Sequence, residues 1–393
     1  MSTELRPSAP AAAAPAPPPP RAAEALRVRG SAVAYRLYDV GYEIRLDRAL
    51  DLLAASAPER VRPVRGEAQA IQIKDLPITV ILGTESLLVA GRRHEVEVSA
   101  RIFDFGVVSL RVRIPAPGEL SFEEFTRFGN TIDAAGAHLP LFEQHLRLLV
   151  ERIAPAVARP QIAPVTEDYI VYRIHRIRSA GGERLTAEAL RDLDVVPLLL
   201  NESRPLSADA RKELLPHRFS YYVDDLAILT WDNALIVDPS PEHDTDVQFI
   251  LEFANAQLLE LRYYDAVLDG ELPKMYDRVA GARRGARALL NRRFAPLLGD
   301  LQTIVADSTE IVERAENSLK VTDDVYLARV YTAALEIFRG RVWRAGIDRK
   351  LGIIRETYAM LNAEAQATRS EALELAIVLL IVAEIVLAVL MRR

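Results

Sequence analysis

The predicted architecture depends most on the C-terminal stretch Glu374-Leu-Ala-Ile-Val-Leu-Leu-Ile-Val-Ala-Glu-Ile-Val-Leu-Ala-Val-Leu-Met-Arg-Arg393. Every side chain from Leu375 to Met391 is apolar except Glu384. A helix over this run would be about 25 Å long, just short of the hydrocarbon core of a bilayer. A buried core helix is the alternative, but such a helix rarely carries apolar side chains on every face and then ends the chain. We therefore expect one transmembrane helix over residues 373–391.

The N-terminal segment, residues 1–29, contains seven prolines and no apolar run typical of a secretory signal peptide. Its prolines also prevent the amphipathic helix of a mitochondrial presequence. We expect a disordered tail rich in proline and alanine. With its membrane helix at the C-terminus, the chain is predicted to be a tail-anchored, single-pass protein of a bacterial inner membrane, with its N-terminal head in the cytoplasm.

The composition is that of a globular protein with room for two or three domains. The chain has 393 residues, of which 50% are hydrophobic and 26% charged, and a net charge of −6. The acidic balance gives no global electrostatic reason to expect nucleic-acid binding. The absence of cysteine excludes disulfides, thiolate nucleophiles and cysteine-ligated metals.

Residues 30–240 mix strand and helix patterns, which predicts an α+β domain. Ser121 and Glu124 have the spacing of a capping box at the start of a helix. Further helices are expected over 46–55, 140–157, 187–193 and 208–215. Strands are expected over 32–38, 71–73, 78–82, 96–103, 107–114, 168–174, 218–223, 226–231 and 234–237.

Residues 241–372 lack strand patterns and are predicted to form a helical, coiled-coil-like stalk. Val247, Leu251 and Leu258 follow the spacing of a helix seam. Gly270 and Pro273 are expected to kink or break the first helix. A second helix is expected over 297–319, and a last helix runs from Asp323 toward the C-terminus. The predicted fold class is an α+β cytoplasmic head, an all-α helical stalk and one C-terminal transmembrane helix.

Two groups of motifs resemble a known family. Lys350-Leu-Gly-Ile-Ile-Arg-Glu-Thr-Tyr-Ala-Met-Leu361 precedes Leu373-Glu374 and Glu384, and Ile102-Phe-Asp-Phe-Gly-Val-Val108 lies upstream. Together they resemble the uncharacterised family that contains the "required for meiotic nuclear division" proteins, over roughly residues 95 to 391. The tryptophan often found after the upstream motif is replaced by Ser109-Leu110, which indicates a distant bacterial member.

The resemblance implies membrane tethering and assembly, and no enzymatic activity or cofactor. A eukaryotic relative in the mitochondrial inner membrane is associated with mitochondrial translation, as an oligomer. The partners expected on this basis are membrane lipid, further copies of the chain, and a ribosome or RNA.

Glu384 is the strongest single-residue signal, because a carboxylate inside a membrane span normally faces a partner helix or a polar cavity. We expect Glu384, with Glu374 at the start of the run, to contact lipid or another copy of the chain. The alternatives are a tolerated glutamate without a role, and ion or proton conduction.

A basic stretch from Lys274 to Arg293 contains Arg278, Arg283, Arg284 and Arg287, which could hold RNA phosphates or anionic lipid. The alternative is a solvated helix face, or ion pairs to Glu310 and Glu313. The six histidines form no metalloprotease motif, and no phosphate loop or nucleophile elbow occurs, so neither a catalytic residue nor a metal site is predicted.

The functional prediction is therefore a non-enzymatic, tail-anchored scaffold or tethering protein that self-associates through its helical region and anchor. The first alternative is an RNA- or ribosome-tethering membrane protein that uses the arginine-rich helix. The second is an unrecognised enzyme in the α+β head, which a deep polar pocket with converging histidines and carboxylates would favour. Whether the head binds a small molecule is left open.

Overall fold

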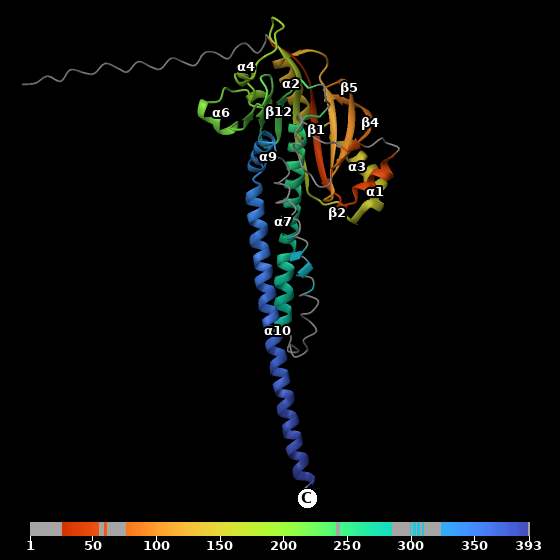
Figure 1. Cartoon of the computed structure of the whole chain (residues 1–393), viewed down its shortest axis with the longest axis vertical. Coiled ribbons are helices and arrows are strands. Elements are labelled where there is room, and N and C mark those ends of the chain that lie inside the picture. Colours follow the sequence, from red (N-terminus) through yellow and green to blue (C-terminus); the bar gives the residue numbers. More distant parts are fainter. Residues whose placement is uncertain are drawn as a thin grey trace, which may run out of the picture.

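The computed structural model describes residues 26–54, 59–60, 76–240, 244–284 and 324–391, together with isolated positions between 299 and 309. A mixed α/β body surrounds one large β-sheet, and two long helices extend from one end of that body (Figure 1).

Ten strands form the large sheet, in the order β10–β11–β12–β9–β1–β6–β5–β4–β3, with β7 paired to the start of β1. Neighbouring strands are antiparallel except β9 and β12, which are parallel. A separate two-stranded sheet joins β2 (Gly41–Ile44) to β8 (Val157–Pro160). The strands of the large sheet are β1 (Arg27–Asp39), β3 (Glu59–Arg60), β4 (Ile78–Val89), β5 (Arg92–Ile102), β6 (Val107–Pro115), β7 (Leu120–Ser121), β9 (Thr166–Arg178), β10 (Arg218–Phe219), β11 (Leu226–Leu229) and β12 (Asn233–Val237).

β1 lies between β9 and β6 and is buried on both faces of the sheet. Ala32 and Ala34 contribute to one hydrophobic core, whereas Val33 and Tyr35 contribute to the core on the opposite face. A strand covered on both sides carries apolar residues at nearly every position. The strand expected over 32–38 is therefore confirmed within β1, and it is buried on both faces, not on one as its partial apolar alternation would predict.

Helices α1 to α5 cover the first face of the sheet. The capping box predicted at Ser121 and Glu124 is confirmed, and it starts α2. Phe122 and Phe125 of α2 and Phe142 of α3 are buried in the first core. These helices are α1 (Leu46–Leu53), α2 (Phe122–Ala135), α3 (Leu139–Ile153), α4 (Ala187–Arg191) and α5 (Val196–Leu199), while α6 (Ala208–Leu214) buries no residue.

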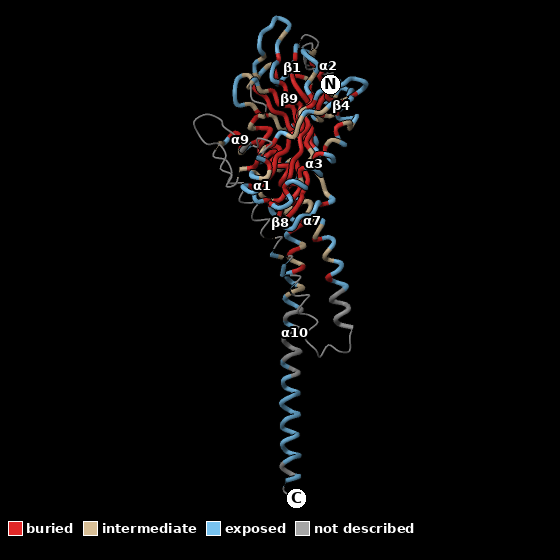
Figure 2. Tube along the Cα trace, turned by 90° about the vertical axis from the view of Figure 1, so that its right-hand side faces the viewer, coloured by how far each residue is buried: buried red, intermediate tan, exposed pale blue. Residues whose placement is uncertain are grey.

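The second face is covered by α7 (Asp246–Arg284) and α9 (Val325–Ile337), through a core that contains Phe249, Phe253 and Tyr331. Beyond the sheet, α7 packs against α10 (Gly340–Met391) to form a two-helix arm. A third core, which includes Leu268 and Leu351, holds the arm together. Buried residues are concentrated in the body, and exposure increases along α10 (Figure 2).

Of the kink or break expected at Gly270 and Pro273, the break is wrong, because α7 continues through Pro273; the kink stays a prediction. Packing on both sides of the proline, at Leu268 and Met275, offsets the backbone hydrogen bond that proline removes. The last helix, expected to run from Asp323 toward the C-terminus, is divided in two: Asp324 caps α9, and Arg339, with φ 52°, separates α9 from α10.

Within the ranges that the structure describes, no helix combines the length and hydropathy needed to cross a bilayer. The predicted transmembrane helix over 373–391 is therefore wrong, and so are the tail anchor and the single-pass inner-membrane localisation. Two physical features of the run oppose it: the stretch from Leu375 to Met391 is shorter than the about 20 apolar residues of a typical span, and Glu384 interrupts it.

Other boundary predictions differ in outcome. The predicted tail over residues 1–29 extends too far, because β1 begins at Arg27; the rest of that tail, residues 1–25, lies outside the described residues. So do the strand predicted over 71–73 and most of the helix predicted over 297–319. The division at 240 and 372 into head and stalk stays a prediction.

Candidate anion-binding site

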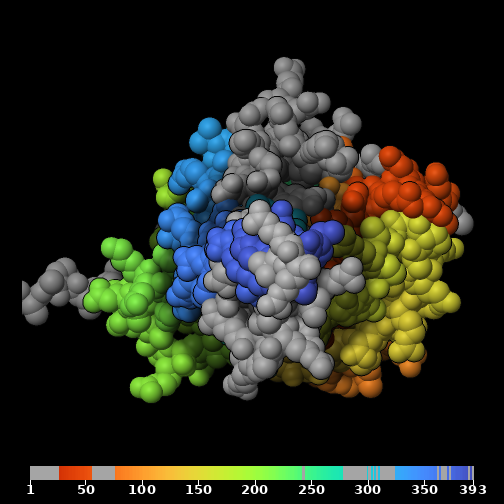
Figure 3. Space-filling view, turned by 90° about the horizontal axis from the view of Figure 1, so that it is seen from below, coloured from red at the N-terminus to blue at the C-terminus, as the bar shows by residue number. Residues whose placement is uncertain are grey.

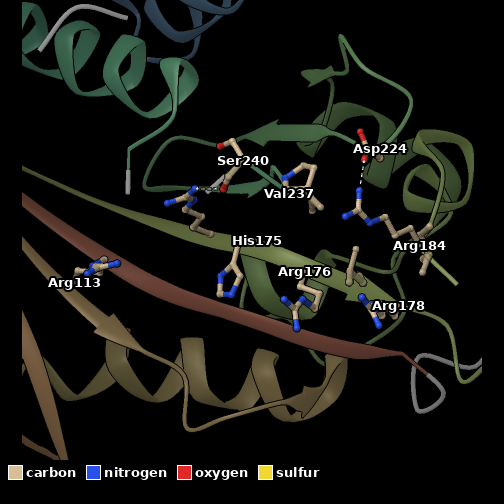
Figure 4. A pocket seen from close by; sticks show the side chains of 12 residues that line it. Arg113, His175, Arg176, Arg178, Arg184, Asp224, Val237 and Ser240 are labelled. Carbon is tan, nitrogen blue, oxygen red and sulfur yellow. Dashed lines mark hydrogen bonds and ion pairs between the residues drawn. The ribbon is translucent and has the colours of Figure 1, made fainter. Parts of the chain in front are cut away.

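A cavity of about 370 Å³ lies on the second face of the sheet (Figure 4). Residues of β6, β9 and the end of β12 line it, together with a hairpin that follows β9. The lining residues are Arg113, Arg173, His175, Arg176, Ile177, Arg178, Arg184, Leu185, Asp224, Val237, Pro239 and Ser240.

A β-bulge in β9 directs the arginines of this strand into the cavity. Arg29 of β1 pairs with Arg176 and Gly30 pairs with Ile174, so His175 has no partner on β1. The extra residue lets both Ile174 and Ile177 point into the first core. Arg176 and Arg178 consequently face the opposite side of the sheet.

The site is strongly cationic, because five arginines and one aspartate line it. Arg173 donates from Nη2 to the backbone oxygen of Ser240 at 3.1 Å, and Arg184 lies 3.6 Å from Asp224. Arg113 is 3.5 Å from Glu97 on the neighbouring strand. These contacts give three of the guanidinium groups a polar partner in the walls of the cavity.

The other two arginines of the cavity differ from these three. Among the described residues, neither Arg176 nor Arg178 forms an ion pair. Arg178 lies directly across a β-bridge from Arg184, in a hairpin that Gly182 closes with φ +84°. Two like charges opposite each other destabilise a strand pair. An anion bound between them would remove this repulsion.

The positive charge of the cavity also affects His175. Burial lowers the pKa of its imidazole, and the neighbouring cations, led by Arg173 and Arg176, lower it further. The ring is therefore neutral near pH 7, and it can donate one hydrogen bond and accept another.

A buried ion-pair network adjoins the cavity at the start of α7. Arg101 and Arg111 both bond to Asp244, and Arg101 also bonds to Glu252 on α7. Burial alone would raise the pKa of Asp244, but the two arginines outweigh burial and hold it well below its usual range. This network attaches α7 to β5 and β6, beside the wall formed by Ser240.

The residues selected from sequence are not part of this cavity. Glu374 and Glu384 lie exposed on α10. Arg278, Arg283 and Arg284 belong to the last turns of α7, but their side chains, and the whole of Arg287, lie outside the described residues. Their roles stay predictions. Among the positions that the structure describes, no three histidine or carboxylate side chains come together as a metal site.

Sequence reasoning missed the cavity arginines. The stretch Arg173-Ile-His-Arg-Ile-Arg178 carried one signal, since three arginines within one strand are unusual for a buried segment. Arg113 and Arg184 reach the cavity through strand pairing and a hairpin, and no local sequence pattern predicts either placement.

Comparison with known proteins gives two matches and one negative result. The family model described as "Uncharacterized protein MJ0711, N-terminal domain" matches residues 29–244, a range that contains every residue lining the cavity. The uncharacterised protein MJ0711 of Methanocaldococcus jannaschii is 29% identical over 191 residues, which cover 49% of this chain and 57% of that relative. The match thus spans less than two thirds of the relative's length. No solved structure matches the chain.

Proposed function

The chain belongs to the family described by the MJ0711 N-terminal domain, and from this premise we propose that its sheet domain binds a phosphate-bearing ligand without catalysing a reaction. The observation that carries the proposal is the cavity lined by five arginines and one aspartate. Arginine presents a planar fork of donors that matches phosphate oxygens, and such charge-assisted bonds are stronger than neutral ones.

The size of the cavity also supports a small ligand, since about 370 Å³ falls at the lower end of the usual range for ligand sites. Binding is favoured over catalysis because, among the described residues, no carboxylate bonds to His175. A catalytic histidine is normally oriented by such a group.

The first test is to titrate the full chain with inorganic phosphate and simple phosphate esters by calorimetry. We expect Arg176→Glu to weaken binding by at least about tenfold, because a hydrogen bond to a charged group contributes about 1.5–3 kcal/mol. Arg147→Glu is the matched control: Arg147 is an exposed arginine of α3, which packs on the first face of the sheet. Equal affinities for the two variants and the unmodified protein would refute the proposal.

Self-association through the helical region is the second candidate function. Its support is the exposure of large apolar side chains along the end of α10, such as Leu380 (70%) and Leu390 (67%). Exposed apolar surface of this extent commonly marks an interaction site, and another copy of the chain would supply a matching helix. Glu384 lies within this run.

A ribosome or RNA contact by Arg278, Arg283, Arg284 and Arg287 is the competing proposal. It is supported by the concentration of arginine in this segment and by the translation-associated relative in the family that the chain resembles. RNA binding that survives Arg176→Glu, but not charge reversal at Arg283 and Arg284, would favour it.

We also propose a relation to the family that contains the "required for meiotic nuclear division" proteins. Its support is the motif Ile102-Phe-Asp-Phe-Gly-Val-Val108 and the pair Leu373-Glu374. A structure of a member of that family tests it, because the same turn and the same strand order should recur. A different strand order would contradict the relation.

A further inference from the structure

We propose that the arginine cavity takes a small molecule with two separate phosphate groups, one bound at each end. This inference rests on the proposed function and adds to it the class of ligand. It follows from the distribution of the cations along β9 and from the residues between them.

The arginines form two groups at opposite ends of the cavity (Figure 4). Near the start of α7, Arg113 and Arg173 form the first group, beside Ser240. At the hairpin end, Arg176, Arg178 and Arg184 form the second group. His175 lies between the two.

The separation of the groups is too large for one phosphate to contact both ends. Arg173 and Arg178 are five residues apart on a strand, which corresponds to roughly 15 Å along the sheet. A phosphate bonds only to guanidinium groups that converge on it at hydrogen-bond distance. A phosphate bound at one end would therefore leave the arginines at the other end without a phosphate contact.

The middle of the cavity suits a short neutral spacer. Val237, which pairs with Ile174 of β9, lines it together with Pro239 and Leu185. Among the described residues that line the cavity, the imidazole of His175 is the one aromatic ring. Proteins that bind single-stranded nucleic acid rely on aromatic side chains that stack on the bases. A small bisphosphate therefore fits these walls better than an oligonucleotide.

The test is a calorimetric titration of the full chain with alkanediol bisphosphates of increasing spacer length, compared with butyl phosphate. We expect one spacer length to bind at least about tenfold more tightly than butyl phosphate, since the second phosphate binds as part of the same molecule. Arg113→Gln and Arg178→Gln, which change opposite ends, should each reduce the affinity for this bisphosphate to that for butyl phosphate. Arg147→Gln is the control, and circular dichroism checks that each variant is folded.

Each outcome decides a different question. If bisphosphates of every length bind no more than about twofold better than butyl phosphate, the two-phosphate inference is overturned while the proposed function stands. If no phosphate ester binds, both fail. If a single-stranded RNA oligonucleotide binds more tightly than every bisphosphate and depends on Arg113 and Arg178, the ligand is a nucleic acid and the small-molecule inference is overturned.

Discussion

At the scale of single residues, Asp39 at the end of β1 has a carboxyl group that the fold keeps partly protonated near neutral pH. Burial raises its pKa to about 7, although the backbone N–H of Gly41 donates to Oδ1 at 3.1 Å and acts in the opposite direction. An aspartate in the unfolded chain ionises near pH 4. Between about pH 4 and 7 the folded protein therefore binds more protons than the unfolded chain. The stability that this group contributes is complete below about pH 4 and is lost as the pH rises through 7.

We therefore expect Asp39→Asn to be more stable than the unmodified protein at pH 8, by on the order of 1–3 kcal/mol, and about equally stable at pH 4. An asparagine oxygen can still accept the Gly41 hydrogen bond. Urea unfolding at several pH values measures the difference, with Asp51→Asn, at an exposed position of α1, as the control. Glu167, whose pKa burial also raises to about 7, should leave a residual pH dependence in the variant. An identical pH profile for Asp39→Asn and the unmodified protein would contradict the prediction.

Gly106 explains at the same scale why the Asp104-Phe-Gly sequence separates two strands. Its φ of +94° is unfavourable for any side chain, and a Cβ there would lie 1.7 Å from the backbone oxygen of Gly41. The turn between β5 and β6 can approach Gly41 this closely only with glycine at position 106. The sequence indicated the turn, whereas the close contact that requires glycine was visible only in the fold.

At the scale of elements, α7 is attached to the sheet by a buried ion pair as well as by apolar packing. Arg101, fully buried on β5, bonds to Glu252 of α7, and its guanidinium lies 4.8 Å from the centre of the Phe249 ring. Asp244 receives a second bond from the same guanidinium at 2.8 Å. Removing one member leaves a charge in the core with an incomplete set of partners.

We expect Glu252→Ala to lower the free energy of unfolding by about 3–5 kcal/mol, because Arg101 then loses its most buried partner. The double variant Arg101→Met with Glu252→Leu should recover most of that loss. Chemical denaturation measures both changes. The control is Asp168→Ala, which removes a partly exposed ion pair with Arg36 at 3.4 Å and should cost about 1 kcal/mol or less. Similar losses for Glu252→Ala and Asp168→Ala would show that the buried pair does not hold α7.

At the scale of the whole molecule, the body and the two-helix arm differ in how completely they bury their apolar side chains. Seen from below, α10 stands in front of the body, with α1 and α3 to one side and α6 to the other (Figure 3). The body encloses its apolar side chains in two cores, whereas the end of α10 leaves residues such as Leu380 and Leu387 exposed. An interaction partner for this part of the helix would bury that surface.

We expect the full chain to associate with itself as its concentration rises, and Leu380→Ser combined with Leu387→Ser to reduce this association. The two leucines are seven residues apart and share one face of the helix, so both would enter the same contact. Sedimentation velocity over a range of concentrations measures the effect, with Glu374→Gln as the control on the same helix. A chain that stays monomeric at every concentration would exclude the self-association proposal.

Local chemistry made several elements predictable from sequence alone. The capping box at Ser121 and the apolar spacing in α7 could be recognised in the sequence, because each depends on residues only a few positions apart. The apolar C-terminal run was equally visible, but its interpretation as a membrane span was wrong, since composition does not reveal what surrounds a helix. The continuation of α7 past Pro273 also required knowledge of the packing against α10.

The arginine cavity was decided by tertiary structure. Arg113, Arg178 and Arg184 come from β6, β9 and a hairpin, and only strand pairing and the bulge at His175 direct them into one space. The sequence by itself determined which residues are charged and indicated many of the strands and helices, though not their exact bounds, because these patterns depend on neighbouring side chains. Which charges converge was determined by long-range pairing in the sheet, since residues distant in the chain become neighbours only when the strands align.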